Sequence, residues 1–510
     1  MSVDLSINPL RKGLIRERAA EPCIFVIFGG TGDLSRRKLL PALYHLHLSN
    51  LLPRGFAIVG YASSEMDDSG YREMAHQAIS KSPTHVPTEG KTWDQFAESL
   101  YYVKRSEDTE HSLDGLKQRV NDLDAAIGTE GNCLFYLAIP PFRFAETAEG
   151  LGEVSLAGNN NTRGWRKLVV EKPLGEDLES AKALNRDMQR FFDEEQIYRI
   201  DHYLGKETVQ NILVFRFANE FVEPLLNAEH VDNIQITVAE TLGLEGRGGY
   251  YDSSGALRDI VQNHMLQMLS LICMNRPHSL DAGAVRDAKI ELFRSIHPVE
   301  QSKVGDIALR GQYTSGSISG EDVPAYTQEK DVAPNSTTET FAVLKLFIDN
   351  PRWKGVPIYL RTGKRLAKRV TEIGITLKKP TEMFPRAGGS GQNVLALNIQ
   401  PDEGISMRFD AKVPGLAYQV QPVRMDFKYG TAFATSVPEA YERLILDAIL
   451  GDQSLFPRAD ATEATWAICD PILKAWLANQ VPLYTYKPGS WGPREAMEFI
   501  ERDGRRWRRL

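Results

Sequence analysis

The sequence predicts an α/β domain followed by a larger α+β domain. Up to about residue 200, continuous apolar runs alternate with helical patterns, as in a doubly wound parallel sheet whose strands are buried on both faces. Beyond that point, segments that alternate between apolar and polar residues take over, as in a mainly antiparallel sheet covered by helices on one side. A chain of 510 residues has room for both. We therefore expect a flexible leader at 1–21, the first domain at 22–200 and the second at 201–510.

The composition excludes several classes of protein. The net charge of −7 at pH 7 argues against a general nucleic-acid or membrane partner. No uncharged apolar run approaches the roughly 18 residues that a membrane-spanning helix needs, and the stretch 1–21 lacks the apolar core of a signal peptide. The 4 cysteines are too scattered for a disulfide framework, and no CxxC pair offers a zinc site. We expect a cytoplasmic protein without a metal ion, whose basic end, 505–510, is a solvated tail.

A glycine turn follows the first predicted strand. The apolar run 23–28 leads into a helical pattern at 35–48, and between them stands Gly29-Gly30-Thr31-Gly32-Asp33-Leu34. In a strand, glycine turn and helix of this kind, backbone amides can approach a pyrophosphate and the helix N-terminus adds its positive end. The spacing is GxxGxx rather than the common GxGxxG, so a tight structural turn is the alternative. The basic residues of the first helical turns can reach a phosphate or form a solvated face; they are Arg36, Arg37 and Lys38.

Three further apolar runs continue the first sheet, and the last of them ends at a lysine. They lie at 56–60, 133–138 and 167–171. Ligands of a doubly wound sheet bind at the carboxyl ends of its strands, which places Lys172 near a cofactor. Together, these patterns predict a Rossmann-like dinucleotide-binding domain.

The segment 198–206, YRIDHYLGK, crowds an acid, an imidazole, a phenol and a primary amine into a short stretch that contains a glycine. Residues of these kinds at a bend suit a site that holds an anion beside a proton-transfer pair. The alternative is a polar loop that closes a helix.

The second domain opens with the period-two segment 233–240. Further β-rich runs follow at 341–347, 373–377, 394–399 and 405–409. Between them, the stretch 255–264 starts a helical pattern that places His264 on its apolar stripe. A lone histidine there is more often a core residue. However, a buried Asp–His pair is what a general base needs, and Asp201 offers the carboxylate.

Together, these residues resemble the glucose-6-phosphate dehydrogenase family, in chain order from about residue 22 to about residue 498. The matching pieces are GGTGDLSRRKL at 29–39, EKPLG at 171–175, RIDHYLGKE at 199–207, GYYDSSGALRDIVQNH at 249–264 and VPIYLRTGKRL at 356–366. The third of these is the most specific and the glycine motif the least.

The resemblance implies that the protein oxidises C1 of D-glucose 6-phosphate to 6-phospho-D-glucono-1,5-lactone by hydride transfer to NADP. This reaction is the first oxidative step of the pentose phosphate pathway. In this family His264 is expected to be the base that takes the proton of the C1 hydroxyl, and Asp201 its partner. The carboxylate should favour the charged imidazole, so activity should fall at low pH. A homodimer or homotetramer is implied as well.

Further roles follow from position in the family motifs. One set matches ligands of the 6-phosphate: His202, Tyr203 and Lys206. A second set matches groups that hold the rest of the substrate: Glu240, Asp259, Lys364 and Arg369. Lys172 matches a lysine between cofactor and substrate, and Pro173 after it is expected to be cis. The cofactor-binding set is Gly29, Gly30, Thr31, Gly32, Asp33, Leu34, Arg37, Lys38, Ser63 and Lys172.

The chain departs from the family at two places. The resemblance implies a preference for NADP. Ser63 stands where the family often has an arginine after the second strand, so we expect this preference to be weaker and NAD to be used weakly. Val370 and the ending RRWRRL differ from relatives that hold a second, structural nucleotide, and no second nucleotide is expected.

Two other functions compete with this one. The first is another NADP-dependent sugar or polyol oxidoreductase, against which the phosphate-binding set argues. The second is a nucleotide-binding regulator without activity, which should have lost the base or its partner. Dimer versus tetramer, a regulatory partner protein and a thiol switch stay open.

Overall fold

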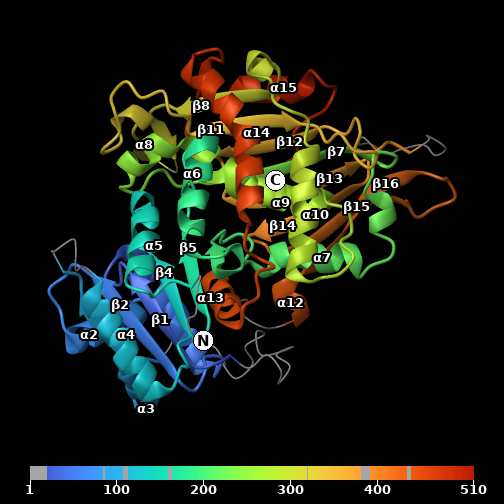
Figure 1. Cartoon of the computed structure of the whole chain (residues 1–510). Helices are drawn as coiled ribbons and strands as arrows, with labels where there is room; N and C mark the ends of the chain where they lie inside the picture. Colours follow the sequence, from blue (N-terminus) through green and yellow to red (C-terminus); the bar gives the residue numbers. More distant parts are fainter. Residues whose placement is uncertain are drawn as a thin grey trace. The chain divides into compact units, whose positions relative to one another are not determined.

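The first sheet of the structure is parallel and six-stranded (Figure 1). Its order is β3-β2-β1-β4-β5-β6, and every neighbouring pair runs parallel. The strands are β1 (Cys23–Phe28), β2 (Phe56–Ala62), β3 (Leu100–Lys104), β4 (Cys133–Leu137), β5 (Arg166–Val170) and β6 (Ile197–Arg199). This is the Rossmann order, with its switch point between β1 and β4. The prediction of a doubly wound domain is confirmed.

The computed structural model divides into two compact units. The first contains Met1–Glu207, Ser279–Arg286 and Thr435–Thr462, and the second Thr208–His278, Asp287–Ala434 and Glu463–Leu510. The residues described are 20–83, 87–106, 113–158, 163–318, 320–380, 391–433 and 438–510. Residues 1–19 of the expected leader lie outside them, and the domain boundaries drawn from the sequence stay a prediction.

Helices cover both faces of the parallel sheet, which explains its uninterrupted apolar strands. Every residue of β1 and β4 is buried. One face packs against α1 (Leu40–Leu48), α2 (Asp68–Ser80) and α13 (Ala440–Leu450). The other packs against α4 (Asp114–Ile127) and α5 (Phe144–Glu153). The remaining helices of this part are η4 (Ser35–Leu39), α3 (Lys91–Glu98), η5 (Pro141–Arg143), α6 (Leu178–Gln189) and η6 (Glu194–Gln196).

The second sheet has nine strands in the order β16-β15-β14-β13-β7-β12-β11-β8-β17. All pairs are antiparallel except β7 with β12 and β8 with β17, so the predicted mainly antiparallel sheet is confirmed. Its strands are β7 (Val231–Ala239), β8 (Ala308–Tyr313), β11 (Phe341–Leu346), β12 (Ile358–Gly363), β13 (Val370–Leu377), β14 (Val394–Gln400), β15 (Gly404–Lys412), β16 (Val420–Lys428) and β17 (Leu483–Tyr486).

Burial across the second sheet is uneven. The central strand β7 is buried at almost every position, whereas β16, at one edge, has no buried residue. The helix pair η8 (Leu257–Met265) and α9 (Leu266–Cys273) is continuous in sequence, and η8 packs on β7 and β12. The other elements are α7 (Glu207–Phe217), η7 (Glu223–Leu225), α8 (Gly248–Ala256), α10 (Ala282–Ser295), η9 (Gln301–Lys303), α11 (Val304–Ile307), the small hairpin β9 (Gly316–Ile318) and β10 (Glu321–Val323), η10 (Tyr326–Gln328), α12 (Tyr429–Phe433), α14 (Ala459–Leu477) and α15 (Arg494–Glu501).

The basic C-terminal end is packed, so the prediction of a solvated tail was wrong. The Trp507 side chain is buried and donates its Nε1–H to the Ala496 carbonyl oxygen at 2.7 Å. Arg505 pairs with Asp232 at 3.0 Å. Arg508 pairs with Glu372 through two nitrogens, at 2.5 and 3.2 Å. The carboxylates that neutralise the run lie in the second sheet, far away in sequence, where a local charge pattern gives no sign of them.

Within the described ranges, no helix is both long and apolar enough to cross a membrane.

Candidate active site

The glycine turn after β1 packs closely against β2 and against the end of β4, the two strands that flank β1. Gly29 has φ +80, and a Cβ there would lie 2.3 Å from the Ala138 carbonyl oxygen, just beyond β4. A Cβ on Gly30 would lie 2.6 Å from the Gly60 Cα in β2. Only glycine fits at such distances. Packing within the protein therefore accounts for both glycines, and the approach of a pyrophosphate to this turn stays a prediction.

Three charged residues of the turn and of the helix after it, Asp33, Arg37 and Lys38, have partners within the protein. Arg37 pairs with Asp33 at 3.3 Å, and both side chains are largely exposed. Lys38 pairs with Glu439. The helix that the sequence predicts at 35–48 is present, but its first part, η4, has π-type hydrogen bonding. Contact of these side chains with a cofactor stays a prediction.

Lys172 lies two residues beyond the end of β5, next to a buried carboxylate. The Lys172–Pro173 bond is cis, as predicted. The neighbouring Glu171 is buried and accepts a hydrogen bond from the Tyr136 hydroxyl at 2.5 Å. Burial raises the pKa of Glu171, while hydrogen bonds from Tyr136 and Tyr441 act against the rise. Sequence reasoning did not single out Glu171, because nothing local shows that this carboxylate is buried.

The segment after β6 gathers the predicted phosphate ligands around one aromatic ring. The Tyr203 ring centroid lies 5.2 Å from that of His202 and 5.1 Å from the Lys206 Nζ. Asp201 is buried, and its Oδ1 accepts the Tyr203 backbone N–H at 3.0 Å. An imidazole, a phenol and an ammonium on one short stretch can hold a dianion.

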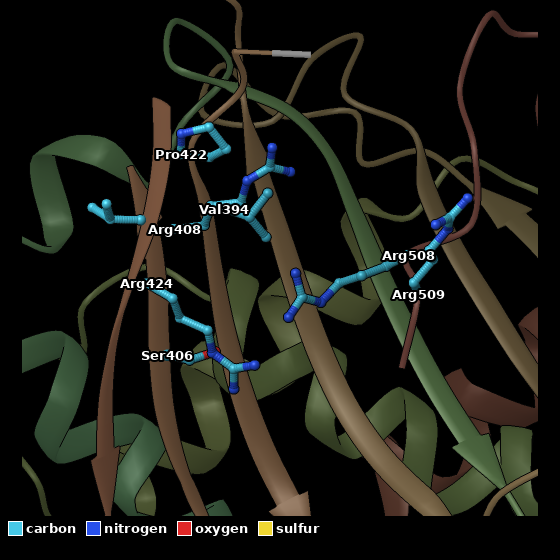
Figure 2. A pocket seen from close by; sticks show the side chains of 8 residues that line it. Val394, Ser406, Arg408, Pro422, Arg424, Arg508 and Arg509 are labelled. Carbon is cyan, nitrogen blue, oxygen red and sulfur yellow. The ribbon is translucent and has the colours of Figure 1, made fainter. Parts of the chain in front are cut away.

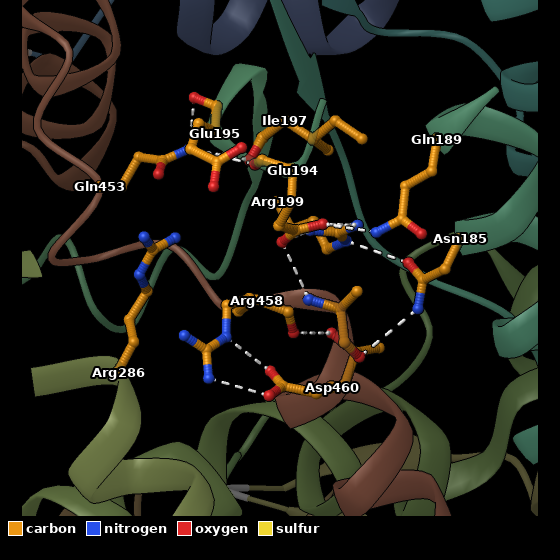
Figure 3. A network of polar contacts seen from close by, with 12 residues as sticks. Asn185, Gln189, Glu194, Glu195, Ile197, Arg199, Arg286, Gln453, Arg458 and Asp460 are labelled. Atoms are coloured by element: carbon orange, nitrogen blue, oxygen red, sulfur yellow. Dashed lines mark hydrogen bonds and ion pairs between the residues drawn. The ribbon is translucent and has the colours of Figure 1, made fainter. Parts of the chain in front are cut away.

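A polar network anchors the start of this segment (Figure 3). The Arg199 guanidinium is fully buried and pairs with both carboxylate oxygens of Glu194, at 2.6 and 3.0 Å. It also donates to the Asn185 Oδ1 at 3.2 Å. Glu194 in turn accepts the Ala459 backbone N–H at 3.0 Å, and the Gln453 Nε2 donates to the carbonyl oxygen of Glu195 at 2.9 Å. The strand that leads to Asp201 is therefore tied to the chain at 453–459.

His264 lies on η8, fully buried. The predicted helix is present, but it has π-type hydrogen bonding over Leu257–Met265. Its N-terminal end is held by Glu339, whose Oε1 accepts the Leu257 N–H at 2.9 Å. Gly255, at φ +68, leaves room for that carboxylate, since a Cβ there would lie 2.4 Å from the same oxygen. Burial raises the pKa of Glu339. Short π-helical turns occur frequently at functional sites.

Three of the predicted substrate ligands gather around Tyr251. The Lys364 Nζ donates to the Glu240 Oε2 at 2.6 Å and lies 4.9 Å from the centre of the Tyr251 ring. The pKa of the Tyr251 phenol is raised well above its usual value, first by burial and then by the charge of Asp259. Arg369, by contrast, is exposed just before β13.

The predicted residues thus form two sets, one in each compact unit. Asp201 belongs to the first unit and His264 to the second. Their pairing stays a prediction.

A pocket of about 320 Å³ in the second unit contains none of the predicted residues (Figure 2). Four arginines line it: Arg408, Arg424, Arg508 and Arg509. Strand register explains part of this charge, because Arg408 of β15 stands opposite Arg424 of β16. Arg424 is paired with Asp426 at 2.6 Å, as Arg508 is with Glu372. The sequence alone does not show the register and so did not predict the pocket.

In the part of the chain that the structure describes, no group of three or more His, Cys, Asp or Glu side chains could hold a metal ion.

Two family models match consecutive parts of the chain and together cover most of it. The model of the glucose-6-phosphate dehydrogenase NAD binding domain matches residues 26–211, and that of the glucose-6-phosphate dehydrogenase C-terminal domain matches residues 213–508. The chain belongs to the glucose-6-phosphate dehydrogenase family. The family predicted from the sequence motifs is confirmed, and the NAD binding domain together with the glycine turn indicates a nicotinamide cofactor.

Individual relatives agree along the whole length. The chain is 44% identical over 510 residues to glucose-6-phosphate 1-dehydrogenase 2 of Mycobacterium tuberculosis, covering 98% of each chain. It is 46% identical over 491 residues to glucose-6-phosphate 1-dehydrogenase of Aggregatibacter actinomycetemcomitans, covering 96% of this chain and 98% of the relative.

Among solved structures, a glucose-6-phosphate dehydrogenase in complex with its substrate glucose-6-phosphate matches with a TM-score of 0.86 and 35% identity, covering 96% of this chain and 99% of that one. Glucose-6-phosphate 1-dehydrogenase from Mycobacterium avium matches with a TM-score of 0.81 and 35% identity, covering the same shares.

Proposed function

We propose that this protein is a glucose-6-phosphate 1-dehydrogenase, which oxidises C1 of D-glucose 6-phosphate to 6-phospho-D-glucono-1,5-lactone with NADP. The observation that carries this function is the match over 96% of the chain, at 35% identity, to a structure that binds glucose 6-phosphate. The reaction would open the oxidative part of the pentose phosphate pathway.

In this reaction the chain's own residues bind the sugar and move one proton. The imidazole of His264 takes the proton from the C1 hydroxyl oxygen while the C1 hydrogen leaves as hydride, so the C–O bond becomes a carbonyl. Asp201 orients the imidazole and stabilises the imidazolium that forms. The bound nicotinamide supplies the hydride acceptor. The burial of both Asp201 and His264 supports these roles, because a proton-transfer pair works best away from bulk water.

The cationic cluster of the first unit binds the phosphate end of the substrate. His202, Tyr203 and Lys206, which lie around the Tyr203 ring, bind the 6-phosphate. Lys172 stands between cofactor and substrate.

The groups around Tyr251 bind the sugar hydroxyls. Glu240 and Asp259 accept hydrogen bonds from these hydroxyls, and Lys364 and Arg369 also hold the substrate. The ion pair of Lys364 with Glu240 supports a shared role, since it keeps both groups in place before the substrate arrives.

We propose that NADP is preferred over NAD. The residues assigned to the cofactor are Gly29, Gly30, Thr31, Gly32, Asp33, Leu34, Arg37, Lys38, Ser63 and Lys172. We also propose that the protein works in the cytoplasm as a homodimer or homotetramer. The four cysteines support a reducing compartment, because all are free and buried.

The test is to follow NADPH absorbance with purified protein, comparing glucose 6-phosphate with free glucose, and NADP with NAD. We expect kcat/KM for glucose 6-phosphate to exceed that for glucose by several orders of magnitude, because only the former engages the cationic cluster. Equal turnover of the two sugars would favour the competing sugar or polyol oxidoreductase instead.

A further inference from the structure

The carboxyl end of β2 decides how a Rossmann-like domain treats the 2′ position of the adenosine ribose. An NAD site places an acid there to accept from the 2′-hydroxyl, whereas an NADP site supplies a cation for the 2′-phosphate. Here the glycine turn and β2 are tied together, because the N–H groups of Gly29 and Gly30 donate to the Tyr61 carbonyl oxygen at 2.8 and 3.3 Å. The stretch 60–64, GYASS, holds neither an acid nor a cation.

The next acidic residue along the chain is Glu65, and its carboxylate is paired with a cation. The Glu65 carboxylate forms an ion pair with the Nζ of Lys104, the last residue of β3. A carboxylate neutralised in this way is a poorer acceptor for a ribose hydroxyl and repels a phosphate less than a lone one would.

Neutral donors surround the same place. The Ser64 and Thr31 hydroxyl oxygens lie 2.9 Å apart, which links the end of β2 to the glycine turn. The Tyr102 hydroxyl donates to the Ser64 carbonyl oxygen at 2.7 Å and so fixes this stretch against β3. Ser63 is left exposed beside them. Hydroxyl groups can bind a phosphate, but they do not neutralise its charge.

Arg105 is a second cation beside this end of β2, next to Lys104 in the chain. Its backbone N–H donates to the Ala62 carbonyl oxygen at 2.7 Å, and its side chain is half-buried. Burial raises the pKa of the Tyr61 phenol to about 12, and the charges of Arg105 and Arg143 act against that rise. Both guanidinium groups therefore lie within electrostatic reach of the Tyr61 hydroxyl. Arg143 is ion-paired with Glu146 at 3.6 Å.

We propose that Arg105 binds the 2′-phosphate of NADP and thereby sets the preference for NADP over NAD, with Ser63, Ser64 and Thr31 as neutral donors beside it. The inference rests on the proposed function, because it concerns the cofactor of the same site. It puts the cation at the end of β3, whereas the sequence directs attention to the glycine-turn helix. Arg37 on that helix pairs with Asp33 instead.

The test measures binding by calorimetry on the full chain without substrate, using adenosine 2′,5′-bisphosphate, which carries the 2′-phosphate, and ADP, which lacks it. Arg105→Ala should weaken binding of the bisphosphate about 10- to 100-fold, as the loss of a charge-assisted bond does. Its affinity for ADP should stay within about twofold. Arg105→Lys should restore part of the loss. Arg186→Ala is the matched control, because Arg186 is exposed, pairs with Asp187 at 3.5 Å and is not assigned to the cofactor; we expect a change of less than about twofold for either ligand.

An Arg105→Ala variant that binds the bisphosphate as well as the wild type does would overturn the proposal. Equal losses for the bisphosphate and ADP would overturn it too, because they would indicate general damage to the site. The measurement needs no glucose 6-phosphate, so it gives a result even if the protein fails to oxidise that sugar. Such a failure would contradict the proposed function and leave the role of Arg105 to be judged by binding alone.

Discussion

The two sheets present their functional groups in different ways. In the parallel sheet the cofactor site that we propose consists chiefly of backbone: a turn at Gly29 and Gly30 that leaves no space for a Cβ. In the unit with the nine-stranded sheet the substrate groups that we propose are side chains: His264 on a π-helix that packs on β7 and β12, and the ion pair of Lys364 with Glu240. A site of the first kind depends on the shape of the backbone, whereas a site of the second kind depends on a few individual side chains.

This difference predicts where single substitutions cost most. A change in a chemical group of the side-chain site should remove rate, while a change in the backbone site should weaken cofactor binding and leave the chemistry of bound complexes largely intact.

The largest effect is expected at His264. His264→Ala should lower kcat about 10²- to 10⁴-fold and leave KM for glucose 6-phosphate nearly unchanged, because the imidazole accepts the proton in the transition state. Steady-state kinetics at saturating NADP measure this. His45, which is also buried and lies 2.9 Å from the Glu442 carboxylate, is the matched control, and His45→Ala should keep kcat within a few-fold. Near-normal kcat for His264→Ala would make it an ordinary core histidine.

A smaller effect on affinity is expected at Lys206. Lys206→Ala should raise KM for glucose 6-phosphate about 10- to 100-fold, the range of a lost charge-assisted contact to phosphate. Free glucose should be affected far less, since it has no phosphate. The comparison of kcat/KM for the two sugars is the readout, and equal losses on both would remove Lys206 from the phosphate site.

The backbone site should respond to Gly30→Ala through the cofactor. The new Cβ would meet the Gly60 Cα at 2.6 Å, so the turn must shift, at a typical cost of about 1–3 kcal/mol. We expect this cost to weaken the binding of NADP or to lower the free energy of unfolding. The kcat at saturating NADP should change little. Gly283→Ala is the control, because a Cβ there has open space around it. If the two variants behaved alike, the close approach would be of no consequence.

The smallest expected effect concerns the thiols. Burial raises the pKa of Cys133 and Cys273 to about 12, so the reactive thiolate is scarce at both positions at pH 8. All four cysteines are buried. Iodoacetamide should therefore leave the native protein unlabelled at pH 8 and modify every cysteine in guanidinium chloride. Reversible inactivation by mild oxidation, lost in a Cys469→Ser variant, would instead reveal a thiol switch.

The parts that the sequence predicted correctly are those that depend on local pattern. Uninterrupted apolar runs predict buried parallel strands because both faces of each strand are covered, and β1 and β4 bear this out. The helices at 35–48 and 255–264 were predicted, but not their π-type turns, because α- and π-helices place apolar residues at similar spacings.

What the sequence could not show depends on contacts between distant segments. The C-terminal arginines were expected in solvent because their carboxylate partners, Asp232 and Glu372, stand 273 and 136 positions away. Glu171, next to Lys172, and Glu339, which accepts the Leu257 N–H at the start of η8, were missed for the same reason. A carboxylate is buried only when segments from elsewhere in the chain pack on it, and the local sequence does not show those segments.

The central claim is that Asp201 of one unit and His264 of the other act as one catalytic pair. A double-mutant cycle on kcat with glucose 6-phosphate and NADP tests it most directly, using Asp201→Asn, which keeps an oxygen for the Tyr203 N–H, together with His264→Ala. If the two act together, the double variant should be about as slow as His264→Ala alone, within roughly threefold. If the two losses multiply instead, Asp201 and His264 act independently and the pairing is wrong.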